Sequence, residues 1–534
     1  MATKLPVIQS RHGMVAAAHP LAAAAGAGVL RDGGNAFDAA AATAAMLNVV
    51  EPFMSGMAGL GLATMWVAAE RRIRVLDFVP PVPASFPVER FSQRSELDRG
   101  AAPVAPPGNL AGWCEMVRSY GTLPLSSIFA PAVKVAAEGF PLQAFGAHEF
   151  ADLAGVMAGY PALFENWSAT YGAHGQNAKP GSIIRQPQLS DTLAAVGREG
   201  PGYLYGGDLG ARIVAHIQSL GGTLTLQDLR HVQPIWKEPV SASYRGVDIH
   251  MPPPPCESFQ ILLALRMLEA VEFGHLPRDG VDHLDLVYRA IRLAAGMRIA
   301  NNDPSPEVLA GLLSDAQIAQ ASVKLMSGIA VEGPTEQWVP TQGQIAKDFN
   351  TTSFSIADRE GNLVCVTQSL GSAFGSGVVV PGTGVCLNNF LYWADVQKGS
   401  PNLAKAGGAL PICMAPSISL RDGVPVLALG TPGSYGILQT QVQAMVQYFD
   451  YGIDLQHAIE APRGRLTDGR SVLIEDRIGT DTVAALRARG HDAALFGADW
   501  TMKVGGMQAV AINPATGIMT GAADPRRDGR VSGV

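Results

Sequence analysis

Histidine and cysteine are the side chains that most often serve as bases, nucleophiles or metal ligands. In this sequence both residue types are spread along the chain without clusters. Three of the 11 histidines stand beside predicted helices, where a structural role is the more common one: His19, His283 and His457. The five cysteines are widely spaced without a Cys-x-x-Cys pair, which predicts reduced, mostly buried thiols: Cys114, Cys256, Cys365, Cys386 and Cys413. The spacing of these residues therefore predicts neither a metal site nor disulfides.

The common catalytic motifs are also missing from the sequence. It has no phosphate-binding loop, no Gly-x-Gly-x-x-Gly, no His-Glu-x-x-His and no Gly-x-Ser-x-Gly elbow. One tract stands out, GSAFGSGVVVPGTGVCLNN at residues 371–389, whose glycines permit tight turns and close backbone approach. A functional loop and a plain glycine-rich hairpin explain this tract equally well.

The elements that would position any site fall into two kinds of segment. Residues 20–50 predict two helices: the first ends at Gly33-Gly34, and the second begins with Asn35 as N-cap and Asp38 in its first turn. The run AFDAAAATAAMLNVV is apolar nearly all round, so this helix should be buried. Further helices are predicted at 208–220 and 280–299, followed by an exposed polar connector at about 328–350.

Strands dominate after residue 351. TTSFSIAD and LVCVTQS flank a DREGN turn and predict a hairpin. More strands are expected at about 377–388, 413–420, 425–431, 472–476 and 507–513, with a helix from residue 437. Because strand-rich and helix-rich blocks are segregated, we expect packed sheets with helices outside and not a Rossmann fold.

Composition narrows the class of protein. Hydrophobic residues make up 47% and charged residues 16% of the 534, which excludes a disordered chain. A net charge of −7 without a basic run argues against a nucleic-acid partner. The N-terminal residues lack a secretory pattern, and the apolar stretch from Met14 to Leu30 is too short and too mild to span a membrane. We therefore expect a cytoplasmic protein with no membrane partner.

Several ordered blocks together resemble the γ-glutamyltransferase (glutathione hydrolase) family of N-terminal nucleophile hydrolases. They include HPLAAAAGAGVLRDGGNAFDAAAATAAMLNVVEPFMSG, residues 107–140, NTTSFSIADREGNLVCVTQSLGSAFGSGVVVPGTGVCLNN and the C-terminal GAADPRRDG. The resemblance implies an α+β fold, a four-layer αββα sandwich. It also implies one intertwined domain made of two autoproteolytic fragments, residues 1–350 and 351–534, with no metal or cofactor.

The family's chemistry maps onto a few positions. Its proenzymes break the bond before the first residue of a Thr-Thr pair, which here is the bond between Asn350 and Thr351. The resemblance implies that Thr351 is the nucleophile and that its freed α-amino group is the base. An α-amine with a pKa of roughly 7.7–8.0 accepts a proton near neutral pH, whereas an amide nitrogen does not. The two fragments would stay together as a heterodimer, with further dimerisation left open.

The resemblance also implies which residues assist the nucleophile. Ser369 stands where the family has a threonine that hydrogen bonds to the nucleophile. The family's oxyanion hole, a Gly-Gly pair, corresponds here to Gly433-Ser434. Only backbone N–H groups are needed there. Ser434 replaces a glycine, which a backbone donor can tolerate if the φ angle at Ser434 is negative.

The substrate-binding positions depart from the family pattern. The sequence lacks the arginine that the family has after Asp77-Phe78. It also lacks the glutamine and aspartate that the family has after Asn388-Asn389, and Ile412-Cys413 replaces a Ser-Ser pair. The residues found there are Val79, Phe390, Trp393, Ile412 and Cys413. These changes remove the ion-pair partners of an amino-acid head group, and burying a zwitterion without partners costs several kcal/mol.

Three functions remain open. The first is an N-terminal-threonine amidohydrolase or acylase that acts on a small amide with a non-glutamyl acyl group and transfers that group to water or an amine. The second is a true γ-glutamyltransferase or glutathione hydrolase that anchors glutamate through other residues. The third is an uncleaved, non-catalytic homologue that only binds a ligand.

Overall fold

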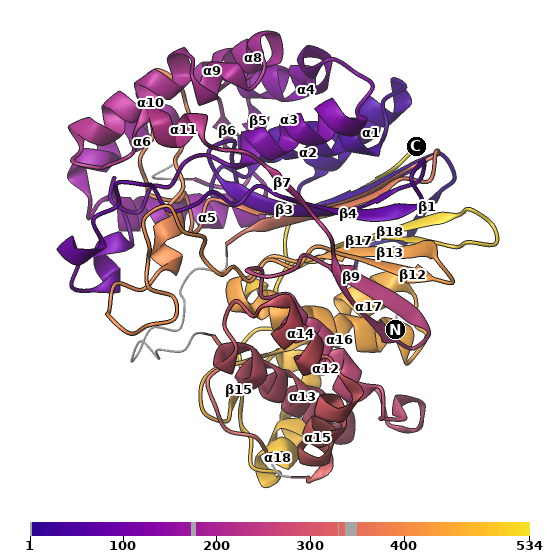
Figure 1. Cartoon of the computed structure of the whole chain (residues 1–534). Helices are drawn as coiled ribbons and strands as arrows, with labels where there is room; N and C mark the ends of the chain where they lie inside the picture. Colours follow the sequence, from indigo (N-terminus) through magenta and orange to yellow (C-terminus); the bar gives the residue numbers. More distant parts are fainter. Residues whose placement is uncertain (1–2, 172–177, 329, 337–349) are drawn as a thin grey trace.

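Two stacked seven-stranded sheets form the centre of the molecule in the computed structural model, which describes residues 3–171, 178–328, 330–336 and 350–534 (Figure 1). The first sheet has the order β1 (Ile8–Ser10), β18 (Met519–Ala523), β17 (Gln508–Ile512), β13 (Val424–Gly430), β12 (Ser417–Arg421), β9 (Val247–Met251) and β8 (Val240–Tyr244). The second has the order β19 (Arg530–Gly533), β2 (Gly13–Ala17), β10 (Thr352–Asp358), β11 (Leu363–Ser369), β3 (Leu60–Val67), β4 (Arg72–Asp77) and β7 (Ile235–Lys237).

The hairpin predicted after residue 351 lies at the centre of the second sheet. Strands β10 and β11 pair antiparallel, with Thr352 opposite Gln368 and Ala357 opposite Leu363. Every residue of both strands is buried, because one face meets the helices and the other meets the first sheet. Strands covered on both faces read as nearly continuous apolar and small-residue runs, as these do.

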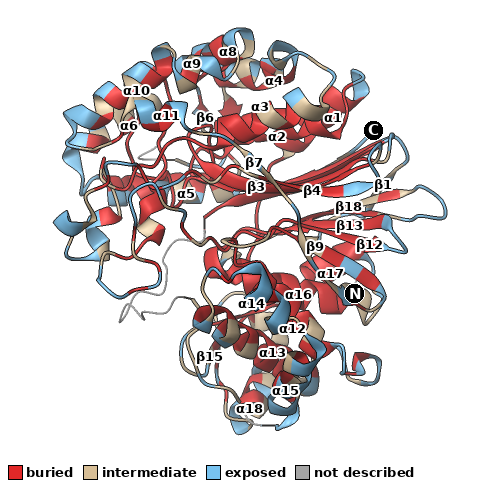
Figure 2. Cartoon of the chain, viewed as in Figure 1, coloured by how far each residue is buried: buried red, intermediate tan, exposed pale blue. Residues whose placement is uncertain are grey.

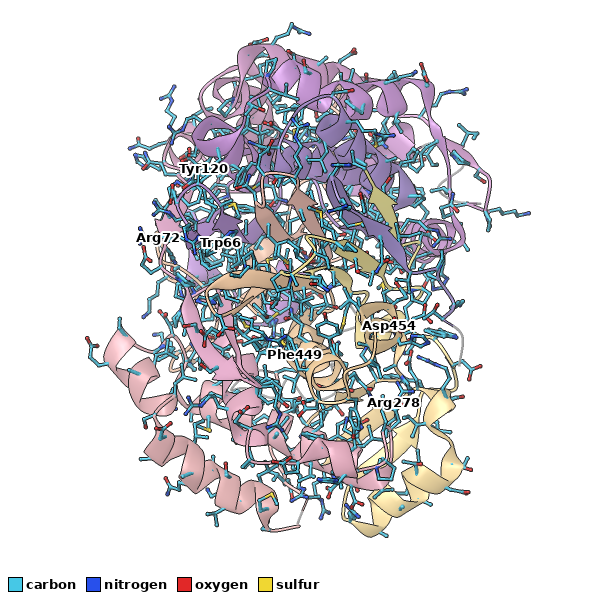
Figure 3. The ribbon with its side chains drawn as sticks, turned by 90° about the vertical axis from the view of Figure 1, so that its right-hand side faces the viewer. Trp66, Arg72, Tyr120, Arg278, Phe449 and Asp454 are labelled. Carbon is cyan, nitrogen blue, oxygen red and sulfur yellow. The ribbon has the colours of Figure 1, made fainter. Side chains whose placement is uncertain are left out.

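Small and apolar side chains fill the space between the sheets. This cluster includes Ala16, Trp66, Cys365, Ile418 and Val510, which come from strands of both sheets. In the side view of Figure 3, Trp66 and Tyr120 lie in the upper part of the molecule, and Phe449 and Arg278 lie in the lower part. The two inner sheets therefore have one outer layer above them and one below.

The upper helical layer begins with the two predicted helices, α1 (Pro20–Arg31) and α2 (Ala36–Val50). Asn35 and Asp38 form a reciprocal capping box at the start of α2, and all residues of this helix are buried. Figure 2 shows α2 as a red element against the sheet. The rest of this half contains α3 (Asn109–Tyr120), α4 (Leu125–Glu138), α5 (Ala144–Met157), α6 (Pro161–Tyr171), α8 (Pro187–Glu199), α9 (Gly202–Tyr205), α10 (Asp208–Ser219), α11 (Leu226–Arg230) and a small sheet of β5 (Phe140–Pro141) with β6 (Ile183–Ile184).

The lower layer covers the other sheet and holds the second large core cluster (Figure 1). Its helices are α12 (Phe259–Leu268), α13 (Val281–Ala300), α14 (Pro306–Leu312), α15 (Asp315–Met326), α16 (Ile437–Phe449), α17 (Leu455–Glu460) and α18 (Thr480–Ala488). A small sheet of β14 (Gly464–Leu466), β15 (Ser471–Ile474) and β16 (Asp492–Leu495) adjoins them. The predictions of a four-layer αββα sandwich and of helices at 208–220, 280–299 and from 437 are confirmed.

Both sides of the Asn350–Thr351 bond contribute to both sheets. In the first sheet β1, β8 and β9 precede the bond and β12, β13, β17 and β18 follow it. In the second, β10 and β11 lie between β2 and β3, so strands from the two sides are hydrogen bonded directly. The fold is therefore one intertwined domain.

One predicted strand is wrong. Residues 377–388 form a loop with a single bridge between Val379 and Cys386, because five glycines of the tract adopt positive φ angles that interrupt an extended strand. Most of the predicted connector, residues 329 and 337–349, lies outside the described residues. Within the part that the structure describes, no helix is long and apolar enough to cross a membrane.

The histidines have structural roles, as predicted, although two of the three are buried. His19 caps α1 by accepting the N–H of Leu21, and burial lowers its pKa to about 4. His283 accepts the N–H of Asp279, and burial lowers its pKa to about 4 as well. His457 pairs with Asp454 at the start of α17. All five cysteines are buried and free.

Candidate active site

Thr351 lies immediately before β10 in a strained backbone conformation. Its φ angle is +95°, which is a genuine outlier for a β-branched residue, and the residue is 5% exposed. Such strain costs on the order of 1–3 kcal/mol and persists only where the surroundings enforce it. A strained residue at the bond expected to break is consistent with a functional role.

The side chain of Thr351 reaches the end of the neighbouring strand. Its Oγ1 donates a hydrogen bond of 3.1 Å to Oγ of Ser369, the last residue of β11. The N–H of Gly371 donates to the same Ser369 oxygen at 3.0 Å. Gly371 has a φ angle of +105°, so the first glycine of the 371–389 tract turns the chain to hold Ser369. The structure thus brings Thr351 and Ser369 together.

The carbonyl of Asn350 is held by the turn that follows β13. The N–H of Gly433 donates to the Asn350 oxygen at 3.2 Å. Arg465 fixes this turn from behind, because its Nη1 donates to the Gly433 carbonyl at 2.9 Å. A hydroxyl beside a carbonyl that already accepts a backbone N–H is the arrangement required for acyl transfer, in which negative charge develops on that carbonyl oxygen.

Ser434 does not have the negative φ angle that would let a serine replace the glycine without strain. Its φ angle is +57°, not negative, so a serine occupies a left-handed position next to Gly433, whose φ angle is +126°. A non-glycine residue in this region costs roughly 1–2 kcal/mol. The Ser434 hydroxyl is buried and has no hydrogen-bond partner among the described residues. The turn after β13 is therefore strained at Ser434, while Gly433 adopts its positive φ angle without that cost.

A buried carboxyl group lies on the other side of the Thr-Thr pair. Glu51, which ends α2, accepts a hydrogen bond of 3.0 Å from Oγ1 of Thr352. Glu51 is 1% exposed, and burial raises its pKa despite the opposing effect of Arg527. Its second oxygen is buried without a partner in the described part of the chain.

A buried guanidinium completes the surroundings of Thr351. Nη2 of Arg527 donates to the Thr351 carbonyl at 2.9 Å. The side chain passes the sulfur of Met502, and its guanidinium lies 5.2 Å from the centre of the Phe145 ring. Residues from before and after the Asn350–Thr351 bond therefore surround Thr351.

The predicted substrate-binding residues gather on the side of the oxyanion turn that faces the lower core. Four of them are buried in the second core cluster: Phe390, Trp393, Ile412 and Cys413. The Trp393 ring lies 5.7 Å from the ring of Tyr435, the residue after Ser434. Val79 is partly buried and packs against the same cluster. Phe390 has no exposed surface, so in this structure it is a core residue.

Two further buried arginines, Arg292 and Arg298, donate their hydrogen bonds to other groups of the protein. On α13, Arg292 donates to the carbonyls of Gly333, Thr467 and Ser471. Arg298 pairs with Glu257 and also bonds to Gln260 and to the carbonyls of Thr335 and Glu336. Both side chains therefore anchor helix and loop in the described structure.

Sequence reasoning missed Glu51, Arg465 and Arg527 as neighbours of the site. Glu51 carries a signal in retrospect, because it is a lone carboxylate at the end of a long buried apolar run. Arg527 lies within the family-like GAADPRRDG block, but nothing in the block distinguishes its two arginines. Arg465 has no local signal, because its contact with Gly433 depends on the packing of β14.

Comparisons with known proteins show the family to which the chain belongs. The family model described as gamma-glutamyltranspeptidase matches residues 22–534. The Acylase ACY 1 proenzyme of Pseudomonas sp. (strain SE83) is 36% identical over 98% of this chain and 94% of its own length. The glutathione hydrolase proenzyme of Bacillus subtilis (strain 168) is 30% identical over 98% of this chain and 92% of its own length. Among solved structures, cephalosporin acylase from Bacillus halodurans superposes with a TM-score of 0.91 at 30% identity, covering 100% of this chain and 98% of that one.

Proposed function

We propose, from the premise that this chain belongs to the gamma-glutamyltranspeptidase family, that it is an autoprocessed amide hydrolase with Thr351 as its nucleophile. The proposal rests on two hydrogen bonds that are made on either side of the Asn350–Thr351 bond. The Thr351 hydroxyl is oriented by Ser369, and the Asn350 carbonyl accepts the N–H of Gly433.

Maturation follows from this geometry. The Thr351 hydroxyl oxygen adds to the Asn350 carbonyl carbon, and the Gly433 N–H stabilises the charge on the carbonyl oxygen. The bond from that carbon to the Thr351 nitrogen then breaks, and the nitrogen takes up the proton that the hydroxyl has lost. Water hydrolyses the resulting ester, which leaves a carboxylate on Asn350 and a free amino group on Thr351.

The mature fragment would repeat the same chemistry on a substrate. The α-amino group of Thr351 takes the proton from its own hydroxyl, which attacks the substrate amide. The N–H groups of Gly433 and Ser434 stabilise the oxyanion, the amine leaves with the proton, and water or another amine removes the acyl group from Thr351. Residues 1–350 and 351–534 would remain associated, since each contributes strands to both sheets.

We further propose that the acyl group of the substrate is not γ-glutamyl. Val79, Phe390 and Trp393 occupy the positions where the family binds the glutamyl carboxylate and ammonium. The 36% identity to an acylase proenzyme supports this choice. A true γ-glutamyltransferase is the second candidate, supported by the glutathione hydrolase relative.

Gel electrophoresis with N-terminal sequencing tests the nucleophile. The purified chain should separate into fragments of residues 1–350 and 351–534, the smaller beginning Thr-Thr-Ser-Phe. The Thr351→Ala variant should stay intact, because no hydroxyl can attack Asn350. A wild-type chain that remains whole after prolonged incubation would refute the mechanism and favour a non-catalytic binding protein.

A substrate panel tests the acyl group. We expect kcat/KM for γ-glutamyl-p-nitroanilide to be at least about a hundredfold below that of the best aryl-acetyl, alkanoyl or dicarboxylic-acid monoamide, since an unpaired buried charge costs several kcal/mol. If the γ-glutamyl compound is the best substrate, the second candidate function holds.

A further inference from the structure

The carbonyl group of Gly433 is held from behind by two donors. Nη1 of Arg465 donates to its oxygen at 2.9 Å, and the N–H of Gly436 donates to the same oxygen at 3.0 Å. This carbonyl belongs to the peptide unit that also carries the N–H of Ser434. Because a peptide unit is planar and trans, its C=O and N–H groups point in opposite directions. The direction of the Gly433 carbonyl therefore fixes the direction of the Ser434 N–H, one of the two groups proposed to stabilise the oxyanion.

The local sequence leaves room for a guanidinium beneath this turn. Arg465 is the middle residue of β14 and is 2% exposed. A Cβ atom at Gly436 would lie 2.6 Å from Nη1 of Arg465, so a side chain at this position would push the guanidinium away from the turn. Nη1 also lies 3.4 Å from the carbonyl oxygen of Lys503, on the loop that follows β16. Arg465 is therefore enclosed on the side of the turn that faces away from Asn350.

The counter-ion of Arg465 comes from the other side of the Asn350–Thr351 bond. Nη2 of Arg465 lies 3.1 Å from Oε1 of Glu336. The backbone at Glu336 is itself anchored, because Arg298 donates to the carbonyls of Thr335 and Glu336. The hydroxyl of Thr335 donates to the carbonyl of Leu466, the residue after Arg465, at 3.3 Å. One guanidinium therefore connects residues that precede the bond to a turn that follows it.

The chemistry of arginine suits this bridge. Its rigid planar fork can hold two acceptors in fixed directions at once, here a carbonyl and a carboxylate. A charged donor on the Gly433 carbonyl also polarises the peptide unit, which makes the Ser434 N–H a stronger donor. Ser434 has a φ angle of +57°, and such strain persists only where the surroundings enforce it. The contact from Arg465 is one that can enforce it.

We propose that Arg465 is a positioning residue of the oxyanion hole, which aims the Ser434 N–H at the substrate and is itself held by Glu336. The inference rests on the proposed function and deepens it. The nucleophile and both oxyanion donors belong to residues 351–534, whereas Glu336 belongs to residues 1–350. The larger fragment therefore continues to support the oxyanion hole after the chain is cleaved.

A pair of arginine variants tests the assignment, with the p-nitroanilide that the wild-type enzyme hydrolyses fastest as substrate. Arg465→Met should lower kcat by about 10- to 100-fold, because a misdirected donor loses most of the effect of an oxyanion contact. KM should stay within about threefold, because the contact is made mainly in the transition state. Both constants are expressed per molecule of cleaved enzyme.

Arg292→Met is the matched control. Arg292 is also buried and anchors the same segment through the carbonyl of Gly333, but its printed contacts do not include the Gly433 turn. Its loss should leave kcat within about threefold of wild type. If both variants lower kcat equally, Arg465 acts only through the stability of the segment, and the proposal is overturned. A wild-type kcat in Arg465→Met overturns it as well.

Arg465→Lys covers the case in which the methionine variant does not fold. Lysine keeps a positive charge beside Glu336, but a single ammonium is a poor match for a carbonyl and a carboxylate held in two directions. We expect kcat to fall by about 3- to 10-fold without a change in KM. A wild-type kcat in this variant would contradict the role of the fork.

Crystal structures in the Thr351→Ala background need no turnover. In the Thr351→Ala chain the Gly433 carbonyl should point at Arg465, and adding Arg465→Met or Arg465→Lys should rotate the peptide unit between Gly433 and Ser434. An unchanged peptide unit would overturn the proposal. A wild-type chain without amide hydrolysis would instead refute the proposed function, and the orientation of this peptide unit would still decide the role of Arg465.

Discussion

Arg526 and Arg527 are adjacent in sequence and both buried, yet their surroundings are opposites. Arg526 bonds to Glu475 and Asp524 and to the carbonyls of Ile459 and Ala461. The same two carboxylates also pair with Arg477 and Arg463. We call this set the C-terminal ion network: Arg463, Glu475, Arg477, Asp524 and Arg526. Its charges raise the pKa of Arg526 and lower the pKa values of Asp524 and Glu475.

The surroundings of Arg527 contain the opposite features. Unpartnered buried atoms occur in the described structure on four neighbouring residues: Glu51, Asn350, Ser434 and Arg527. Positive φ angles occur at Thr351, Gly433 and Ser434. Buried polar groups are normally satisfied, so exceptions gathered in one place call for a reason. The ion network is therefore rigid, while the neighbouring residues around Thr351 combine backbone strain with polar atoms that lack partners. Both features are typical of functional sites.

The largest effect should come from breaking the ion network. Arg526→Met leaves Glu475 and Asp524 with fewer partners in a buried site, which typically costs about 3–5 kcal/mol of stability. Arg527→Met leaves no carboxylate without its salt bridge, and the lost hydrogen bond from a charged donor to Thr351 should cost about 1.5–3 kcal/mol. Thermal midpoints at one scan rate measure the difference.

The comparison is best made in the Thr351→Ala background. Both variants should then stay uncleaved, so that maturation does not enter the unfolding signal. Equal losses in the two variants would show that Arg527 is also a structural charge and would remove the contrast between the two regions.

The next effect concerns turnover. Ser369→Ala removes the acceptor of the Thr351 hydroxyl and should lower turnover by roughly ten- to a thousandfold, the range for a positioned polar group. Ser369→Thr should retain most activity if the extra methyl fits. Stability should change little, because Ser369 lies at the end of β11 and outside the ion network. Wild-type rates in the alanine variant would mean that Ser369 does not position the nucleophile.

Much of the fold could be predicted because its signals are local. The capping box of Asn35 and Asp38 and the hairpin around residues 359–362 act within a few residues of chain. The close pairing of Thr351 with Ser369 followed from the resemblance together with this hairpin. The contacts of Glu51 and Arg527 could not be predicted, because they bring together the end of α2 and the C-terminal segment through tertiary packing.

The φ angle of Ser434 could not be predicted for the same physical reason. The sign of its φ angle depends on how the turn after β13 is held, by Arg465 behind it and by Asn350 in front of it. Neither partner is near in sequence. A rule based on residue type alone favours a negative φ angle for serine, and the tertiary contacts override that preference.

The smallest expected effect tests this strain. Ser434→Gly relieves the left-handed conformation and removes a buried hydroxyl without a partner in the described structure, so stability should rise by about 1–2 kcal/mol. Part of that gain is offset by the greater freedom of glycine in the unfolded chain. Turnover should stay within about threefold of wild type, because only the backbone N–H is used at an oxyanion hole. Ser434→Ala separates the two contributions, since it removes the hydroxyl and keeps the strain. If Ser434→Gly is stabilised but turnover collapses, the serine hydroxyl itself acts on the substrate.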